Sequence, residues 1–262
     1  MKIHYLGTCS GTEPMADMHH TSYVFEIAGS VYWMDAGENA AHRAYTSGID
    51  FLASRAIFVS HAHVDHIGGL PNILFVFHKL NAMYKTPLYN DNTVKLYLPD
   101  KTYFEPTVKI ALGNRYKNSK MTFNIEEHVI SDGVIYEDEN VKVTAYHNNH
   151  LGEADESGWH SFSFVIEAEG KRIVCTGDIK DYSELDLLPV DSCDLLIGET
   201  GHHKVSRVLE CLHEKNVKRF RFIHHGREIL ADRGAAEKTV LEFSEKSGID
   251  VKLCFDGMTE EL

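Results

Sequence analysis

Four side chains that can bind a metal ion lie within six consecutive positions of this chain. They are His61, His63, Asp65 and His66. They directly follow residues 56–59, a short apolar run that predicts a buried strand leading into a loop. Because side chains two residues apart on a strand point the same way, His61 and His63 can face one ion while Asp65 and His66 face another. The pattern predicts a metal centre at a strand end. Its nitrogen and oxygen ligands suit Zn²⁺, with Mn²⁺ or Fe as alternatives.

Strand and helix patterns alternate along the chain without a linker or a repeat. Strands are predicted over residues 23–27, 31–35, 56–59, 141–146, 161–168, 172–176, 195–198, 220–223 and 249–255. Helical periodicity predicts helices over 67–83, 204–215 and 235–247. This order favours one α/β domain over residues 1–262, with helices covering packed sheets. Residues 81–127 give the weakest pattern, and we expect an insertion there that shapes a substrate site.

The charge balance restricts the partners. Lys and Arg total 26 and Asp and Glu total 39, so the formal net charge is -13. Such a chain repels polyanions, which disfavours nucleic acid as a partner without excluding it, and disfavours an anionic membrane surface. No apolar run is long enough to predict a membrane span. The five cysteines form no Cys-x-x-Cys pair, and residues 1–7 do not resemble a secretory signal, so we expect free thiols and a cytoplasmic protein.

The His-x-His-x-Asp-His segment resembles the metallo-β-lactamase superfamily. Four further segments resemble the other motifs of that family, in the same order: Asp35-Ala36-Gly37, Asn149-His150-Leu151-Gly152, Thr176-Gly177-Asp178 and Phe222-Ile223-His224-His225-Gly226. The resemblance implies a four-layer αββα sandwich. Residues 6–12 and 161–164 are similar to ribonuclease Z and related phosphodiesterases, which places the chain closest to that branch. Dimers are common in the branch, so a homodimer is a further expectation.

The resemblance also implies a set of ligands for two divalent ions. By the family pattern, His61, His63 and His150 hold the first ion. Asp65, His66 and His224 hold the second, and Asp178 bridges both.

Two of these assignments have neighbours as alternatives. His147 is the alternative to His150, and the glycine that follows Leu151 favours His150. His225 is the alternative to His224, and the first histidine of such a strand-end pair normally binds the metal. Asp35 is expected to accept a hydrogen bond from a ligand histidine, although a turn aspartate is the other interpretation.

The segment from Glu199 to His203 also follows a predicted strand. It is similar to the glutamate-containing segment of ribonuclease Z-like proteins. Glu199 is expected to orient a ligand histidine or to help protonate a leaving group, and His202 or His203 to bind a substrate oxyanion. A polar cluster at a helix N-terminus is the alternative. Asp65 is expected to orient the attacking hydroxide or to accept its proton.

These residues together predict a metal-dependent hydrolase. In this hypothesis a hydroxide shared by the two ions attacks a phosphodiester, in a small molecule or a larger substrate. The alternatives are a lactonase or another ester or thioester hydrolase of the same fold, and a non-catalytic metal-binding module. Transfer RNA 3′ processing is less favoured, because the chain lacks a long basic arm between the second and third motifs.

Overall fold

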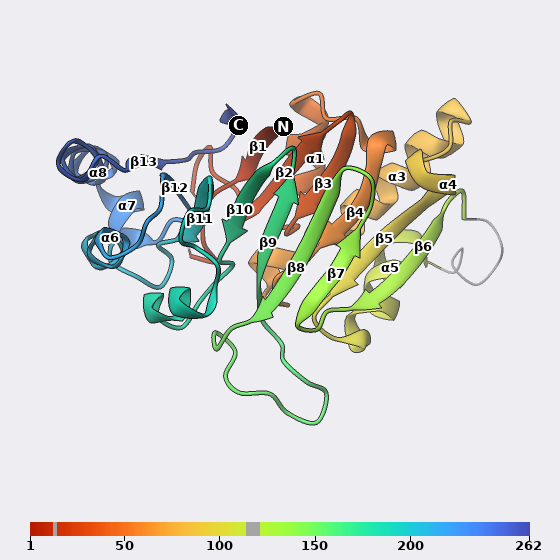
Figure 1. Ribbon diagram of the computed structural model, residues 1–262. Helices are drawn as coiled ribbons and strands as arrows, with labels where there is room; N and C mark the ends of the chain where they lie inside the picture. The colour runs from red at the N-terminus through yellow and green to blue at the C-terminus, as the bar shows by residue number, and fades with distance from the viewer. Residues whose placement is uncertain (13–14, 114–120) are drawn as a thin grey trace. The chain divides into compact units, whose positions relative to one another are not determined.

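The computed structural model describes residues 1–12, 15–113 and 121–262, except for the side chains of residues 89–90. The contacts divide the chain into two compact units. The first unit comprises Met1–Gly7, His19–Ile130 and Asp256–Leu262, and the second comprises Thr8–Met18 and Ser131–Phe255. Each unit is built on one seven-stranded sheet (Figure 1).

The sheet of the first unit has the strand order β14-β1-β2-β3-β4-β5-β6. Its strands are β1 (Lys2–Gly7), β2 (Ser22–Ile27), β3 (Ser30–Met34), β4 (Ser54–Phe58), β5 (Thr93–Leu98), β6 (Asn124–Val129) and β14 (Thr259–Glu261). The strands from β14 to β3 pair antiparallel, and those from β3 to β6 pair parallel. The parallel part needs helical crossovers, because parallel neighbours cannot be joined by a tight turn.

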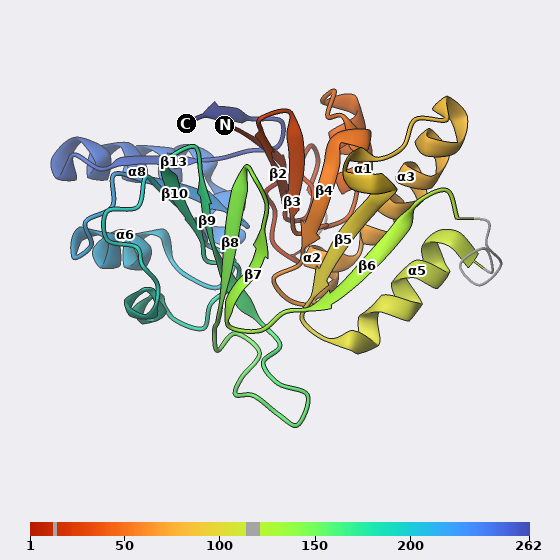
Figure 2. The same cartoon turned by 45° about the vertical axis from the view of Figure 1, so that its right-hand side comes forward.

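Helix α3 (Leu70–Tyr84) covers the core of the first unit. It buries Leu70, Ile73, Leu74 and Phe77, which recur at the spacing of one helix face. The ring of Phe77 lies edge-on to that of Trp33, with centroids 6.4 Å apart. The other helices are α1 (Ala40–Thr46), η1 (Phe51–Ala53), α2 (Val64–Ile67), α4 (Tyr89–Asn92), η2 (Lys101–Tyr103) and α5 (Phe104–Leu112). Figure 2 shows α3 and α5 beside β4, β5 and β6.

The sheet of the second unit has the order β13-β12-β11-β10-β9-β8-β7. Its strands are β7 (Gly133–Glu137), β8 (Val141–His147), β9 (Phe162–Ala168), β10 (Lys171–Cys175), β11 (Leu195–Glu199), β12 (Arg219–Ile223) and β13 (Asp250–Leu253). Strands β7 to β10 pair antiparallel and β10 to β13 parallel. The parallel strands β10, β11 and β12 therefore end at the same edge of this sheet, and a polar loop follows each of them.

Helices cover the second sheet near its parallel strands (Figure 1). They are η4 (Tyr182–Leu187), α6 (Val205–His213), α7 (Arg227–Ala231) and α8 (Arg233–Ser247). Helix α6 buries Val205, Val208, Leu209 and Leu212 in the core that also holds Phe220 and Phe222. Helix α8 is capped by Asp232, whose carboxylate accepts a hydrogen bond from Ala235 N.

The predicted α/β class and the predicted strands and helices are confirmed. The expected insertion at residues 81–127 is wrong for the described part of that range. Strands β5 and β6 extend the first sheet, and α5 packs against α3, so these residues belong to the core of the first unit. Residues 114–120 of that range lie outside the described residues. Within the parts of the chain that the structure describes, no helix combines the length and the apolar character needed to cross a membrane.

Candidate metal centre

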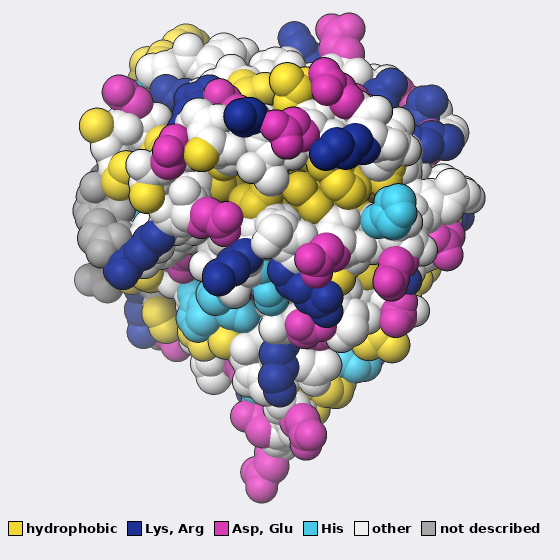
Figure 3. All heavy atoms as spheres, turned by 90° about the vertical axis from the view of Figure 1, so that its left-hand side faces the viewer, with side chains coloured by type: hydrophobic (Ala, Val, Ile, Leu, Met, Phe, Trp, Pro, Cys, Tyr) yellow, Lys and Arg dark blue, Asp and Glu magenta, His cyan; other side chains and the backbone are white. Residues whose placement is uncertain are grey.

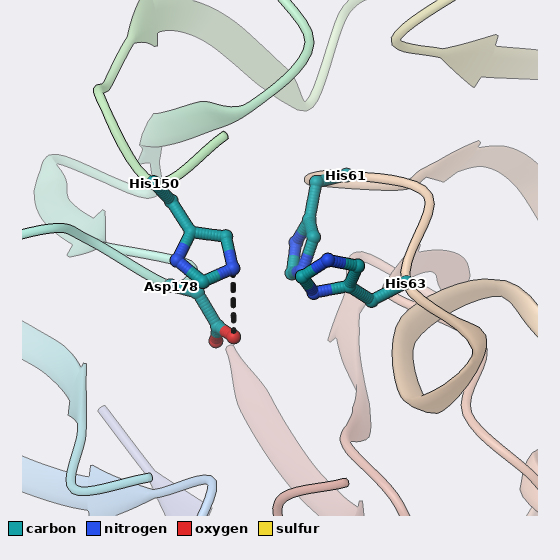
Figure 4. Close-up of side chains that lie close together, drawn as sticks. All are labelled: His61, His63, His150 and Asp178. Carbon is teal, nitrogen blue, oxygen red and sulfur yellow. Dashed lines mark hydrogen bonds and ion pairs between the residues drawn. The ribbon is translucent and has the colours of Figure 1, made fainter. Parts of the chain in front are cut away.

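In the first unit, the loop after β4 carries four of the predicted ligands. His61 is fully buried, and Nε2 of its ring lies 3.0 Å from Nδ1 of His63 (Figure 4). His63 has an extended backbone and immediately precedes α2. Asp65 and His66 lie in the first turn of α2, and both are buried. The loop therefore gathers imidazole and carboxylate groups at the end of a core strand, as predicted.

Asp35, which directly follows the neighbouring strand β3, holds this loop. Its carboxylate accepts hydrogen bonds from Ser60 N at 2.7 Å, from Ser60 Oγ at 3.0 Å and from His66 Nδ1 at 2.9 Å. Because Nδ1 of His66 donates to Asp35, Nε2 is the nitrogen that keeps a lone pair for a metal. That Nε2 lies 3.7 Å from Asp65 Oδ2. The prediction that Asp35 accepts a hydrogen bond from a candidate ligand histidine agrees with this geometry.

Two glycines allow the backbone of this loop to pack closely. Ala36 N donates to His66 O and Gly69 N donates to Ala36 O, both at 2.7 Å. A Cβ on Gly69 would lie 2.0 Å from Gly37 O, and one on Gly37 would lie 2.6 Å from Asp65 O. Any larger side chain at either position would push the Asp35 turn and the histidine loop apart.

In the second unit, Asp178 lies among three imidazole rings. Its Oδ2 is 3.3 Å from His224 Nε2, and 3.7 Å from both His150 Nε2 and His202 Nδ1. Figure 4 shows the pair of His150 and Asp178. Asp178 follows β10 and His224 follows β12, and these two parallel strands lie on either side of β11, so they deliver both residues to the same sheet edge. His224 has a φ of 49°, in the left-handed region that bulky residues rarely adopt.

Glu199, at the end of β11, lies behind this cluster. Its carboxylate is 1% exposed and accepts hydrogen bonds from His202 N at 2.9 Å and from His202 Nδ1 at 3.0 Å. His203 Nε2 lies 3.4 Å from the same carboxylate and donates to Ile179 O at 3.0 Å. Burial alone would raise the pKa of Glu199, but the hydrogen bonds from the histidines lower it well below its usual range. Glu199 is therefore ionised, and its carboxylate fixes the position of His202 and His203.

The pKa of His202 changes in the opposite direction. Its hydrogen bond to Glu199 raises the pKa of the imidazole above the ordinary value, against a smaller effect of burial. The side chain of His202 is 43% exposed, so it reaches solvent while its Nδ1 stays on Glu199. On the face that Figure 3 draws, histidine side chains gather at the surface with Lys and Arg side chains beside them.

The two alternative histidines lie elsewhere. His147 bonds to Asp132, with Nδ1 2.6 Å from Oδ2, and stacks on Trp159. His225 is fully buried and donates from Nε2 to Cys254 O, and burial lowers its pKa to about 4. His150 and His224 are therefore the members of these pairs that face Asp178. His203, which we named only as an alternative to His202, lies against Glu199 and the Asp178 loop.

The donor set fits a divalent metal ion. Asp178, Glu199, His202 and His224 each offer one ligand atom, and these atoms all lie within 4.8 Å of one another. Asp178 and His224 belong to the predicted ligand set, whereas Glu199 and His202 are hydrogen-bonded to each other. Two donors at ordinary Zn–N and Zn–O bond lengths of about 2.0–2.2 Å are roughly 3.3 Å apart when they share a tetrahedral ion. The 3.3 Å from Asp178 to His224 matches this, and the 3.7 Å distances need small movements. Neutral imidazole and carboxylate are the donors that Zn²⁺, Mn²⁺ and Fe accept.

Two mixed sheets flanked by helices, with histidine and aspartate clusters after their parallel strands, define a metallo-β-lactamase fold protein. Solved structures share this fold over the whole chain. A metallo-β-lactamase fold protein from Bacillus subtilis aligns with a TM-score of 0.74 at 15% identity, covering 100% of this chain and 99% of that one. The short form of human tRNase Z aligns with a TM-score of 0.71 at 18% identity, covering 100% and 99%.

Within that class, the chain belongs to the family described as Anti-Pycsar protein Apyc1, whose profile matches residues 1–246. A ribonuclease Z from Shouchella clausii is 31% identical over 175 residues, which is 65% of this chain and 49% of that protein. The chain thus spans about half the length of this curated relative. The predicted superfamily and its ribonuclease Z-like branch are confirmed.

Proposed function

We propose that this protein is a metal-dependent phosphodiesterase with two divalent ions, most simply zinc. The observation that carries the proposal is the position of Asp178 in the second unit, where its Oδ2 faces Nε2 of two predicted ligands, His224 at 3.3 Å and His150 at 3.7 Å. The first unit holds its own buried candidate ligands, Asp65 and His66. The family pattern implies that the two sets serve one centre, with the seven predicted ligands assigned as above.

Each residue of the proposed centre has a separate role in the reaction. When bound, the two ions supply acidity to a water molecule and neutralise charge on phosphate oxygens. Asp65 would orient the attacking water and accept its proton. Asp35 and Glu199 hold ligand or neighbouring histidines in a fixed tautomer through the hydrogen bonds described above. His202, with a raised pKa and an exposed edge, would donate a proton to the leaving oxygen.

The substrate we propose is a small phosphodiester. The ribonuclease Z relative is named for an enzyme that cleaves phosphodiester bonds, and we extend this bond type to the present chain as a proposal. The net charge of -13 opposes a long polyanion, whereas two cations would attract a small anion locally. The family description also names an anti-Pycsar protein, and we propose that this chain acts in the same way.

The first test combines metal content with activity. Wild-type protein should contain two metal equivalents per chain by elemental analysis and should hydrolyse bis-p-nitrophenyl phosphate with Zn²⁺ or Mn²⁺. His63→Ala should abolish the hydrolysis, while His128→Ala, in β6, should preserve it. Metal-free wild type, or a His63→Ala variant with full activity, would refute the proposal.

The second test addresses His202. A general acid matters when the leaving group is a poor one, so His202→Asn should lower kcat on a dinucleotide or a cyclic nucleotide by about 10²–10⁴-fold. The same variant should change kcat on bis-p-nitrophenyl phosphate by less than about tenfold, because p-nitrophenolate leaves without a proton. Equal losses on both substrate types would assign His202 to metal binding instead.

A further inference from the structure

Two turns of the second unit carry His150 and Asp178. The His150 turn follows β8, and the Asp178 turn follows β10. These strands are not neighbours, because β9 lies between them in the sheet. The ring of His150 nevertheless faces the carboxylate of Asp178 at 3.7 Å. Pairing with β9 sets the spacing of the two strands, and contacts between the turns themselves are needed to hold the two side chains at this distance.

Asn148 joins the two turns on their buried side. This residue is 2% exposed. Its Oδ1 accepts hydrogen bonds from His150 N at 3.2 Å and from Ser161 Oγ at 2.6 Å. Its Nδ2 donates to Thr176 O at 3.4 Å, two residues before Asp178. Ser163 Oγ donates to the same carbonyl at 2.6 Å and is itself 3.3 Å from Asn148 Nδ2.

Glu184 joins the same two turns on the outer side. Its Oε2 accepts hydrogen bonds from Asn149 N at 2.8 Å and from Asn149 Nδ2 at 3.3 Å. Its Oε1 accepts from Lys180 N at 3.0 Å and from Asp181 N at 3.3 Å. Asn149 directly precedes His150, and Lys180 comes two residues after Asp178. The two bridges thus attach on opposite sides of Asp178 and on the same side of His150.

A helix cap explains only part of the role of Glu184. Asp181 and Glu184 form a capping box at the start of η4, in which the Asp181 side chain accepts from Glu184 N and the Glu184 side chain accepts from Asp181 N. The Asp181 side chain also accepts from Ser183 N. That motif requires no contact with Asn149. Yet the shortest hydrogen bond of Glu184, at 2.8 Å, is the one from Asn149 N. The carboxylate therefore makes its closest contact with the His150 turn, 35 residues away in sequence.

We propose that Asn148 and Glu184 are positioning residues that set His150 and Asp178 at ligand distance before a metal ion binds. The inference rests on the proposed function, since it gives the pair a shared ion to hold. Ligands fixed in advance lose less conformational freedom on binding, so the affinity for the ion rises. Partners outside the ligand set typically contribute about 10- to 100-fold to metal affinity in this way.

The experiment measures zinc affinity on the full chain by competition with a chromogenic chelator, together with the Tm of the metal-free protein. Glu184→Ala should weaken one of the two zinc-binding steps by about 10- to 100-fold. Glu184→Gln should lie between Glu184→Ala and wild type, because its one carbonyl oxygen can serve one of the two turns. Asn148→Asp keeps the acceptor for His150 N but replaces the donor to Thr176 O with an acceptor, so it should weaken the same step.

Asp181→Ala is the matched control. It removes the other half of the capping box and leaves the contact between Glu184 and Asn149, so it should lower the Tm and leave zinc affinity unchanged. Zinc affinity of Glu184→Ala equal to wild type, or an equal loss in Asp181→Ala, would overturn the inference while the proposed function survives. Wild type that binds no zinc would overturn both.

Discussion

At the residue scale, the space beside a glycine backbone determines where the ring of a candidate ligand histidine can lie. Gly201 shows this for His224. A Cβ on Gly201 would lie 2.3 Å from His224 Nδ1 and 2.5 Å from its Cε1. The ring occupies the volume that any other residue at position 201 would fill. The glycine is therefore part of the His224 site although it offers no ligand atom.

Gly201→Ala should consequently displace His224. A misplacement of about 1 Å can cost on the order of 10²-fold in activity, so kcat/KM on bis-p-nitrophenyl phosphate should fall by roughly that factor. Zinc affinity should fall with it. Gly234→Ala is the control, because the nearest atom to its Cβ would be Asp232 Oδ1 at 3.7 Å. That variant should keep full activity. Unchanged zinc affinity in Gly201→Ala would show that the ring has room to move.

Some of the candidate site residues could be predicted from the sequence, and others could not. His150 and His224 could be chosen over their neighbours from the family pattern, and the Glu199 and His202 pair lies at a local spacing of three residues. Glu184 could not be found in this way. Its spacing from Asp181 predicts a helix cap, but its contact with Asn149 depends on where two separate turns lie in the fold. Long-range side-chain contacts leave no periodic signal in a single sequence.

At the element scale, the strands that were not predicted are β1, β5, β6, β7 and β14, and β6 shows one physical reason. The predicted strands have apolar or alternating patterns that match a buried sheet. Strand β6 is mostly exposed, since it lies at the edge of the first sheet, so its sequence shows no apolar run. Its pairing with β5 makes it a strand. Edge strands are weakly specified by pattern, because fewer of their side chains reach the core.

An ion pair links β12 to β13 and gives the second sheet a pH dependence. Arg221 is 1% exposed, and its Nη2 donates to Asp250 Oδ2 at 2.7 Å. Burial alone would raise the pKa of Asp250, but the Arg221 guanidinium lowers it below its usual range. A depressed folded-state pKa stabilises the protein above the unfolded pKa of about 4. This contribution is lost as the pH falls through the folded-state pKa.

Asp250→Asn should therefore be less stable than wild type at pH 7, and the difference should shrink toward pH 3. Urea unfolding of both proteins at a series of pH values measures this difference. Lys252→Gln is the control, because Lys252 lies on the same strand and its pairing with Asp250, at 3.7 Å, is solvent-exposed. A stability difference in Asp250→Asn that is constant with pH would mean that the carboxylate charge does not contribute.

At the scale of the whole molecule, the proposed function predicts that metal binding couples the stability of the two units. Each unit has its own sheet, its own core and its own set of candidate ligands. An ion that binds only the folded chain stabilises it by RT ln(1 + [L]/Kd), about 2.7 kcal/mol at 100 times Kd. If ligands from both units hold the same ions, both units gain this stabilisation together.

Chelation of the metal should accordingly lower the Tm of the whole chain in a single transition. A ligand variant in either unit, His61→Ala or His224→Ala, should then reduce the stabilisation by zinc to a similar extent. The scan follows intrinsic fluorescence and circular dichroism, with His128→Ala as the control that retains the full zinc effect. Two separate half-sites would give a different result. Each variant would then lose the stabilisation by zinc in its own unit only. The other unit would still unfold in a second transition that zinc stabilises. The number of transitions in the variants therefore tests whether the two ligand sets form one centre.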